Sequence, residues 1–560
     1  MSDVVAVLSA RLTAAAVEAF GLSADPELRA ATKPEFGHFQ SSVALRLAKQ
    51  LGQAPRQIAE QLVAQAEVGD LCTLEVAGAG FVNLTLLPST LAAGVNLPTR
   101  LPGNGKTVVV DYSQPNVAKQ MHVGHLRSTV IGDALCNVLQ YAGYAVVRQN
   151  HVGDWGTQFG MMVEQLLAEG TPAGELDLEE MQQLYQRSRR HFDSDPAFVG
   201  LSRRRVVLLQ SGDPETRGIW QQLVDISLAE FDRVYAFLGS PLTQADVVGE
   251  SAYNADLPSI VDDLDAAGLL TVSDGAQCAF LDGFTGRDGS PLPVIVRKSD
   301  GGFGYSATDL AAVRHRVRDL HADRIVYVVD HRQTLHFQQI FALARAANWL
   351  PETTKAEHVA FGTVLGPDGK PFKTRDGGTV YLVSLLDAAV ARATTLLADR
   401  EGIDRAAVAR AVGIGAVKYA DLSSDRTNDY VFDLDRMVAM TGNTGPYLQY
   451  AHARLTRLLT KAGTTDDKVT VLHDPAEQRL ALLLAGFDDA VLQVAETLQP
   501  HRLCTYLYDV ATALSAFYES CPVLTSEGET RSSRLALCAA TRAVLHDGLT
   551  LLGMTAPDAM

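Results

Sequence analysis

The residues best suited to chemistry lie in one stretch of the chain, between Asp111 and Thr129. Within it, His122 and His125 flank Gly124, which has no side chain to keep a ligand away from the backbone. An imidazole can donate a hydrogen bond to a phosphate oxygen as charge builds up during transfer. The free backbone N–H groups at the start of a helix also favour anions. The stretch therefore predicts a phosphate-binding site.

The flanking sequence predicts which elements hold this stretch. Residues 107–110 read as a short buried strand, and apolar residues at helical spacing from Leu126 to Leu139 predict a helix that stops near Gly143. Residues 145–148 read as a second strand. A parallel sheet presents its ligand crevice at such a strand–loop–helix turn. The stretch is neither a Walker A loop nor a Gly-x-Gly-x-x-Gly fingerprint, which disfavours a P-loop NTPase and a simple dehydrogenase.

A family resemblance follows from the longer pattern. His122-Val-Gly-His125 resembles the His-Ile-Gly-His signature of class I aminoacyl-tRNA synthetases. The enclosing Ser113-x-Pro-Asn-x-Ala-Lys-x-x-His-x-Gly-His-Leu-Arg-Ser-Thr129 is similar to the version in arginyl-tRNA synthetases, and the resemblance runs from near residue 1 to the C-terminus. It implies an α/β catalytic domain with a doubly wound, Rossmann-like parallel sheet over residues 104–390. This domain would carry a helical insertion at about 161–270, between an N-terminal α+β tRNA-contact domain (1–103) and an all-α anticodon-binding domain (391–560).

Composition sets limits on this interpretation. A chain of 560 residues can hold three or more domains. The net charge of −17 is mild evidence against a nucleic-acid partner, because phosphate neutralisation dominates such affinity, although net charge does not report a local patch. The six cysteines are scattered without a Cys-x-x-Cys pair, which argues against structural zinc and predicts a reducing cytoplasm. No apolar run is long enough to span a membrane, and the N-terminus reads as an amphipathic helix, not a signal peptide.

A second constellation suits a guanidinium group. Tyr305 and Asp309 are four residues apart near the start of a predicted helix, where they can share a face, and Ser306 or Thr308 could cap that helix. A carboxylate accepts paired N–H bonds and a phenol packs on the guanidinium plane. Gln333, after a buried strand, could complete the pocket. The set resembles the family's arginine-recognition residues, and a polar site of this kind can reject other amino acids without an editing domain.

The resemblance assigns further contacts to the small substrates. Asp111 would receive the α-ammonium group of arginine and Asn116 an α-amino or carboxylate group, although both also suit an ordinary turn. Phe372-Lys-Thr-Arg375 stands where the family carries Lys-Met-Ser-Lys-Ser, so Lys373 matches one lysine and Lys119 would replace the missing one. The remaining ATP contacts implied by the resemblance are Gly153, Asp154, Phe361 and Gly362, besides His122, Gly124 and His125.

The expected contacts with tRNA lie at the two ends of the chain. After about residue 390 the pattern is helical, with helices predicted at 406–420, 437–460, 475–497, 500–520 and 530–552. Unstacked bases favour aromatic and arginine planes, and by the resemblance Tyr447, Tyr450 and Arg454 would meet the anticodon while Phe81 and Asn83 would meet an exposed loop base. Taken alone, these aromatic residues also fit a helical or sheet core.

The resemblance implies an arginine–tRNA ligase, which uses ATP to make arginyl-adenylate and passes arginine to the 3′-terminal adenosine of tRNA(Arg), releasing AMP and pyrophosphate. Mg²⁺ would arrive bound to ATP, with no dedicated metal site on the protein. The partners would be tRNA(Arg), L-arginine and ATP, the enzyme would be a cytoplasmic monomer, and bound tRNA would be needed before arginine is activated. Another class I synthetase and a non-catalytic RNA-binding paralogue are the alternatives.

Overall fold

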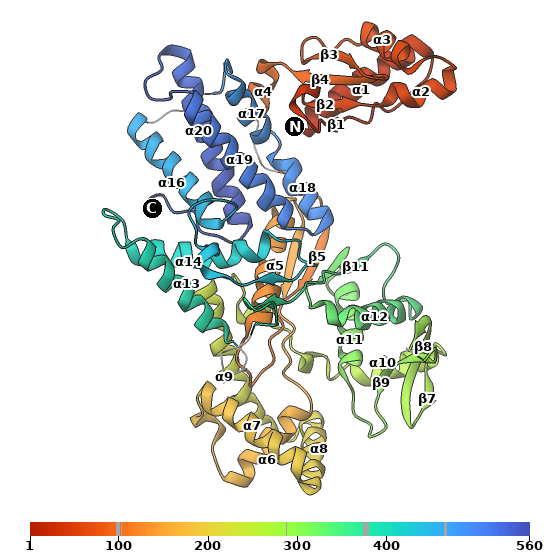
Figure 1. Ribbon diagram of the computed structural model, residues 1–560. Coiled ribbons are helices and arrows are strands. Elements are labelled where there is room, and N and C mark those ends of the chain that lie inside the picture. The colour runs from red at the N-terminus through yellow and green to blue at the C-terminus, as the bar shows by residue number, and fades with distance from the viewer. Residues whose placement is uncertain (97–100, 102, 287, 373–379, 464–467) are drawn as a thin grey trace.

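The computed structural model describes residues 1–96, 101, 103–286, 288–372, 380–463 and 468–560. Figure 1 shows three parts that follow one another along the chain: a small N-terminal part, a central part built on a parallel sheet, and a C-terminal helical bundle. The bundle packs on the central part, and the N-terminal part sits beside the far end of the bundle.

The N-terminal part is a four-stranded antiparallel sheet covered by helices. Its strand order is β1-β2-β4-β3. Val82, Leu84 and Leu86 alternate along β4 and are buried because one face of the sheet packs on the helices. The strands are β1 (Arg29–Ala30), β2 (Phe39–Ser41), β3 (Cys72–Ala77) and β4 (Phe81–Leu86); the helices are α1 (Ser2–Phe20), α2 (Val43–Leu51), α3 (Pro55–Gln65) and, leading out, α4 (Pro88–Val95).

The central sheet has four parallel strands in the order β11-β10-β5-β6. Val108 and Val110 of β5 face the core that includes α5, whereas Val109 faces the core that includes α11 and α12, so helices cover both faces. The chain runs outward from β5 to β6 on one side and from β10 to β11 on the other. The reversal between β5 and β10 is where such a fold binds its ligand. The elements are β5 (Thr107–Asp111), β6 (Ala145–Gln149), β10 (Arg324–Tyr327), β11 (Lys355–His358), α5 (Val123–Tyr141), α11 (Tyr305–Arg318) and α12 (Thr334–Ala346).

The helical insertion after β6, at residues 157–266, is larger than the two or three helices that the sequence predicted. Its described residues form five α-helices, because aspartate–proline and glycine breaks at Asp195-Pro196 and Gly212-Asp-Pro214 divide the helical pattern into short pieces. A small antiparallel sheet follows, and the strand expected near residues 293–298 belongs to it. The elements are α6 (Thr157–Glu169), α7 (Leu178–Ser194), α8 (Pro196–Ser211), α9 (Pro214–Leu238), α10 (Leu257–Ala266), β7 (Thr271–Ser273), β8 (Ala276–Thr285) and β9 (Pro291–Arg297).

The C-terminal bundle departs from the predicted helices in two places. The helix expected from residue 437 begins at Gly445, where Thr444 caps it by accepting a hydrogen bond from the Tyr447 N–H. The helix expected over 475–497 is two helices separated at Ala485-Gly486. The elements are α13 (Leu382–Leu396), which spans the domain boundary expected at 390, α14 (Arg405–Leu422), α15 (Leu434–Met437), α16 (Gly445–Ala462), α17 (Pro475–Leu484), α18 (Phe487–Thr497), α19 (His501–Ser520) and α20 (Gly528–Leu551), with short strands β12 (Val364–Leu365) and β13 (Tyr430–Val431) paired in parallel.

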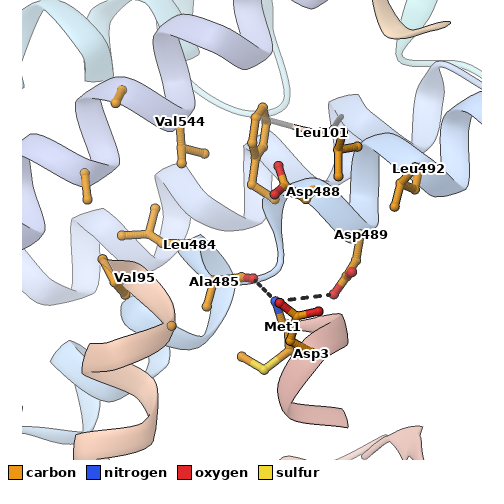
Figure 2. A pocket seen from close by; sticks show the side chains of 14 residues that line it. Met1, Asp3, Val95, Leu101, Leu484, Ala485, Asp488, Asp489, Leu492 and Val544 are labelled. Atoms are coloured by element: carbon orange, nitrogen blue, oxygen red, sulfur yellow. Dashed lines mark hydrogen bonds and ion pairs between the residues drawn. The ribbon is translucent and has the colours of Figure 1, made fainter. Parts of the chain in front are cut away.

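The N-terminal part is fastened to the bundle by polar contacts. The α-ammonium group of Met1 donates to the Ala485 carbonyl at 2.8 Å and lies 3.9 Å from the Asp489 carboxylate, beside the pocket in Figure 2. Asn96 forms two hydrogen bonds with the backbone of Val469. Within the described part of the chain, none of the helices has the length and apolar character needed to cross a bilayer.

Candidate active site

The predicted site residues gather where three parallel strands end. Asp111 closes β5 and pairs in register with Gln149 at the end of β6 and with Tyr327 at the end of β10. The segments after these strands carry the histidine signature, the residues around Gly153 and Gln333, respectively. The pocket of Figure 2 lies elsewhere, between the N-terminal part and the bundle. The chemistry is therefore expected at the switch point of the sheet.

The two signature histidines hold each other and the start of α5. His122 is the N-cap residue of α5, and its Nδ1 accepts from the Gly124 N–H at 3.0 Å. His125 Nδ1 accepts from the His122 N–H, also at 3.0 Å. Because both Nδ1 atoms are acceptors, each neutral ring carries its proton on Nε2. Burial is the main cause that lowers the pKa of both rings, to about 3 for His125, where His122 and Lys119 add to the effect. The site thus offers two neutral N–H donors at a helix N-terminus, which suits phosphate oxygens.

Gly124 and Gly153 occupy positions that leave no room for a side chain. A Cβ atom at Gly124 would lie 2.8 Å from His122 Cε1. A Cβ atom at Gly153 would lie 2.6 Å from Asn116 Oδ1, and Asn116 and Gly153 form an isolated parallel bridge. The structure therefore brings Asn116, which is exposed, next to Gly153 beside the signature helix.

The loop between β5 and α5 has a strained backbone. Ser113, Gln114 and Ala118 have positive φ angles of 72°, 52° and 66°, which non-glycine residues rarely adopt. Each of these residues donates its backbone N–H to a side chain from another element: Ser128 of α5, Asn150 after β6 and Ser227 of α9. Such strain costs of order 1–3 kcal/mol per residue and persists where surrounding contacts over-determine it.

Asp111 is engaged more fully than a free ligand group would be. Its side chain is 2% exposed; Oδ2 accepts from Arg316 at 2.6 Å and Oδ1 accepts from Gln114 at 2.7 Å. Arg316 also donates to Gln149 and lies 4.8 Å from the centre of the Tyr327 ring. Asp111 and Arg316 thus join α11 to the strand ends, and a direct contact between Asp111 and the α-ammonium group of a substrate stays a prediction.

Asp309 and Tyr305 lie on the first two turns of α11. Asp309 is 15% exposed, and its Oδ2 accepts from His336 Nε2 at 2.6 Å. Tyr305 is 64% exposed, and its ring centre lies 4.9 Å from that of His336. The predicted cap at Ser306 or Thr308 is wrong, because α11 starts after Gly304 without a side-chain cap and Thr308 donates back to the Tyr305 carbonyl.

The remaining residue expected to contact the substrate arginine is Gln333. Gln333 is exposed in the 3₁₀ turn His331–Gln333, directly before α12. His336, which contacts both Tyr305 and Asp309, lies one turn further along the same segment. Sequence reasoning missed His336, although a histidine three residues after Gln333 at a strand end was a visible signal.

Glu250 is a second residue that sequence reasoning missed. Burial, followed by the charges of Asp309 and Asp154, raises the pKa of Glu250 to about 8. Asp154 is itself buried and accepts from the Ser251 N–H at 2.9 Å and from its hydroxyl at 2.5 Å, so it positions the segment that carries Glu250. A contact between Asp154 and ATP stays a prediction. A buried carboxyl group whose pKa is raised by neighbouring carboxylates suits a cationic ligand.

The residues directly after β11 form the wall of the site that lies opposite the signature helix. Phe361 is buried, and the Gly362 N–H donates to the Arg426 carbonyl at 2.9 Å. A Cβ atom at Gly362 would lie 2.6 Å from Asp429 Oδ1. Lys119 lies on the signature side, with its Nζ 4.7 Å from the Tyr185 ring centre. Lys373 lies outside the described residues.

The candidate RNA contacts differ in their accessibility. On α16, Tyr450 is exposed, and the Arg454 guanidinium lies 4.1 Å from the ring centre of Tyr518. Tyr447 is half-buried with its hydroxyl 3.2 Å from that of Ser515. In β4, Phe81 is half-buried, whereas Asn83 is only 4% exposed and accepts a hydrogen bond from Gln40.

Comparison with known proteins assigns the family. Residues 6–86 match the arginyl tRNA synthetase N terminal domain, residues 87–434 the catalytic domain of tRNA synthetases class I (R), and residues 448–560 the DALR anticodon binding domain. The arginine–tRNA ligase of Cutibacterium acnes is 52% identical over 99% of this chain and 100% of the relative. That of Laribacter hongkongensis is 48% identical over 99% of each chain.

The chain belongs to the arginyl-tRNA synthetase family.

Solved structures of arginyl-tRNA synthetases share the architecture of this chain. The enzyme from Plasmodium falciparum superposes with a TM-score of 0.84 at 29% identity, covering 99% of both chains. The enzyme from Thermus thermophilus gives 0.81 at 25% identity, covering 99% of this chain and 100% of that one. The predicted family and fold class, a class I catalytic domain between an N-terminal domain and a helical anticodon-binding domain, are confirmed.

Proposed function

We propose that this chain is an arginine–tRNA ligase that works in two steps. The carboxylate of L-arginine attacks the α-phosphorus of ATP, forming arginyl-adenylate and expelling pyrophosphate. A ribose hydroxyl of the 3′-terminal adenosine of tRNA(Arg) then attacks the adenylate carbonyl, and AMP leaves. The observation that carries the proposal is the pair of neutral histidine donors at the start of α5, across the same strand ends from a carboxylate-rich pocket.

The nucleotide side would act by positioning and charge stabilisation. His122 and His125 would donate Nε2–H bonds to the α-phosphate, where negative charge grows as arginine attacks. Gly124 and Gly153 would let the nucleotide approach the backbone. Phe361 and Gly362 would form the other wall of the ATP site, and Asp154 would be a further contact to ATP. Lys119 and Lys373 would neutralise the departing pyrophosphate, with Mg²⁺ carried in by ATP.

The amino-acid side would recognise the guanidinium group by charge. Asp309 can accept from two guanidinium N–H groups, Tyr305 can pack on the guanidinium plane, and Gln333 supplies an amide. When a cation enters, Glu250 becomes a second carboxylate. The positive charge offsets the burial and the nearby charges of Asp309 and Asp154, which together raise the pKa of Glu250. Asn116 would bind the α-amino or carboxylate group of arginine, and Asp111 would receive its α-ammonium group.

The tRNA side would use the outer faces of the two flanking domains. Tyr450 and Arg454 offer the most accessible planes on α16, with Tyr447 beside them and Phe81 and Asn83 on the N-terminal sheet. We propose that the enzyme acts as a monomer in the cytoplasm, and that bound tRNA(Arg) is required before arginine is activated.

Arginine-dependent exchange of pyrophosphate into ATP, measured with and without tRNA(Arg), tests the proposal. We expect exchange only when tRNA is present. Asp309→Asn should reduce exchange at limiting arginine, while the response to ATP concentration is kept. Exchange without tRNA would refute the tRNA requirement alone. Well-folded protein with tRNA affinity but without exchange in either condition would refute the ligase and favour an RNA-binding paralogue.

A further inference from the structure

We propose that Arg127 is a positioning residue of the nucleotide site, and that through it the helical bundle sets the distance between the two walls that hold ATP. The inference rests on the proposed function and goes beyond it, because it names the part of the molecule that controls the geometry of the site. The bundle acts through residues 421–432, here called the crossing segment, which runs from the end of α14 through β13.

Arg127 forms a fully buried ion pair on the signature helix. It lies two residues after His125, and its side chain and that of Asp421 are 1% and 0% exposed. Arg127 Nε lies 3.3 Å from Asp421 Oδ1 and 3.2 Å from Oδ2, and one terminal N–H group donates to the Asn428 carbonyl at 3.1 Å. The guanidinium also lies 5.2 Å from the ring centre of Tyr430. The first turns of α5 are therefore joined to both ends of the crossing segment.

The same crossing segment holds the opposite wall. Arg426 donates to the Ala360 carbonyl at 2.7 Å and accepts from the Gly362 N–H. The Tyr430 N–H donates to the Thr363 carbonyl, which begins the pairing of β12 with β13. Further along, the Phe432 ring stacks on Phe372, with ring centres 5.2 Å apart. Residues 360–372, which lead to Lys373, thus take their position from the segment that also holds Arg127.

The crossing segment is fixed to the bundle at its other side. Asp421 belongs to α14, and Arg426 Nε donates to the carbonyl of Leu498 at the end of α18. Tyr419, two residues before the segment, donates its hydroxyl to the Cys504 carbonyl in α19. A rotation of these helices must carry the crossing segment with it.

The burial of the ion pair makes the connection stiff. Separating the partners of a buried pair leaves an uncompensated charge, which is strongly unfavourable, so Arg127 follows Asp421 and does not release it. The Nε2 donors of the signature histidines and the wall at Phe361 and Gly362 therefore keep one separation, which changes only when the bundle moves. RNA bound on α16 is well placed to cause that movement, because α16 packs against α14.

Substitution of Arg127 by lysine tests the role while keeping the charge. A lysine cannot reach Asp421 and the Asn428 carbonyl with the fork geometry of a guanidinium. We expect Arg127→Lys to raise the KM for ATP and to lower kcat for pyrophosphate exchange about tenfold or more, since a displacement of about 1 Å can cost about a hundredfold. The KM for arginine should change little, because Asp309 and Tyr305 are held by α11.

A matched control separates positioning from stability. Arg534→Lys alters a similar pair, in which Arg534 Nε lies 2.6 Å from Glu477 and the side chains are 14% and 2% exposed, within the bundle and away from the strand ends. It should lower Tm as Arg127→Lys does and leave exchange unchanged. Arg426→Met is the second variant, since it loosens the other wall without leaving a buried carboxylate unpaired.

The outcomes distinguish the inference from the proposed function. Exchange by the unaltered enzyme supports the ligase whatever the variants do. Equal kinetics for Arg127→Lys, Arg426→Met and the unaltered enzyme, with only a lower Tm, would overturn the positioning role. A KM for arginine that rises as much as the KM for ATP would also overturn it, because the defect would then be general. If Arg127→Lys does not fold, the ATP kinetics of Arg426→Met decide the question in the same way.

Discussion

Three carboxyl groups near the start of α11 have different neighbours. Asp154 accepts two hydrogen bonds from Ser251, and Asp309 accepts one from His336. Glu250 instead has a pKa raised to about 8, first by burial and then by the other two carboxylates. Near neutral pH, Glu250 is therefore mostly protonated in the free protein, and a bound guanidinium group should cause it to lose its proton.

Arginine binding should consequently release a proton, and arginine affinity should rise with pH from about 6 to 8, by at most about tenfold per pH unit. Calorimetry in two buffers of different ionisation enthalpy measures the proton released. Glu250→Gln should abolish both the release and this pH slope. The same slope in Glu250→Gln would assign the titration to another group.

Stability has the opposite pH dependence in the free protein. Because the pKa of Glu250 rises from 4.5 to about 8 on folding, the folded state binds more protons than the unfolded state between these values. The contribution of Glu250 to stability is fully present below pH 4.5 and is lost as pH rises to about 8. Glu250→Gln should make Tm less dependent on pH in this range.

Residue types at fixed spacing are enough to predict much of the candidate site. His122, His125, Tyr305 and Asp309 can be chosen from the sequence because a signature or a helical spacing marks them. Glu250 cannot, since its shifted pKa comes from Asp309 and Asp154, which are distant in sequence and meet it only in the fold. The assignment of the histidine protons likewise requires the hydrogen bonds at Nδ1.

At the scale of elements, the signature helix lies unusually close to its strand. A Cβ atom at Gly132 of α5 would lie 2.2 Å from Tyr112 Cδ2, and Tyr112 is fully buried. Tyr112 also donates to Asp133 at 2.8 Å, which fixes its ring under the helix. The position of α5, and with it the histidine pair, depends on the missing side chain at residue 132.

Gly132→Ala should therefore lower the free energy of unfolding by about 1–3 kcal/mol or more through overpacking, and should also reduce pyrophosphate exchange. Gly200→Ala is the matched control, because α8 leaves open space at that helical position. It should stabilise the protein by about 0.5–1 kcal/mol, since alanine favours a helix. Chemical denaturation and exchange assays measure both effects. Equal behaviour of the two variants would contradict the close packing at Tyr112.

Apolar periodicity predicted the existence of the main elements better than their ends. It located α5, β5 and β10, because each buries a continuous or regularly spaced apolar face. It merged α17 with α18 and undercounted the insertion helices, since the periodicity continues across short breaks. The positive φ angles of the loop after β5 could not be predicted from the sequence, because they occur at residues other than glycine. They depend on hydrogen bonds from side chains of three other segments.

At the scale of the whole molecule, Asn96 at the end of α4 is one of the residues that tie the N-terminal domain to the bundle. Asn96 Nδ2 donates to the Val469 carbonyl at 2.8 Å, and Asn96 Oδ1 accepts from the Val469 N–H at 3.1 Å. Val469 is 3% exposed, so its backbone groups would be left without these partners if the amide were removed. Asn96 therefore contributes, together with Met1, to the joint between the N-terminal domain and the bundle, the two regions proposed above to contact tRNA.

Asn96→Ala should weaken that joint by about 1–3 kcal/mol, the cost of leaving buried polar groups unsatisfied. We expect weaker tRNA(Arg) binding in a filter assay, because the two regions would no longer be held in one arrangement. The KM values for ATP and arginine at saturating tRNA should not change. Altered KM values would show that the N-terminal domain influences the catalytic site directly.

The order in which the chain is synthesised gives the strained loop a further consequence. The N-terminal sheet closes with residues 1–86 alone, whereas Ser113 needs Tyr235, 122 positions later, and Asp111 needs Arg316, 205 positions later. At about 5–20 residues per second, ribosomal synthesis separates Asp111 from Arg316 by roughly 10 to 40 s. During that interval the nascent chain can already fold its N-terminal sheet, while the strand ends of the candidate ATP site are still incomplete. A message truncated before β10 would therefore yield a product with a folded N-terminal domain but without the strand ends that build the candidate active site.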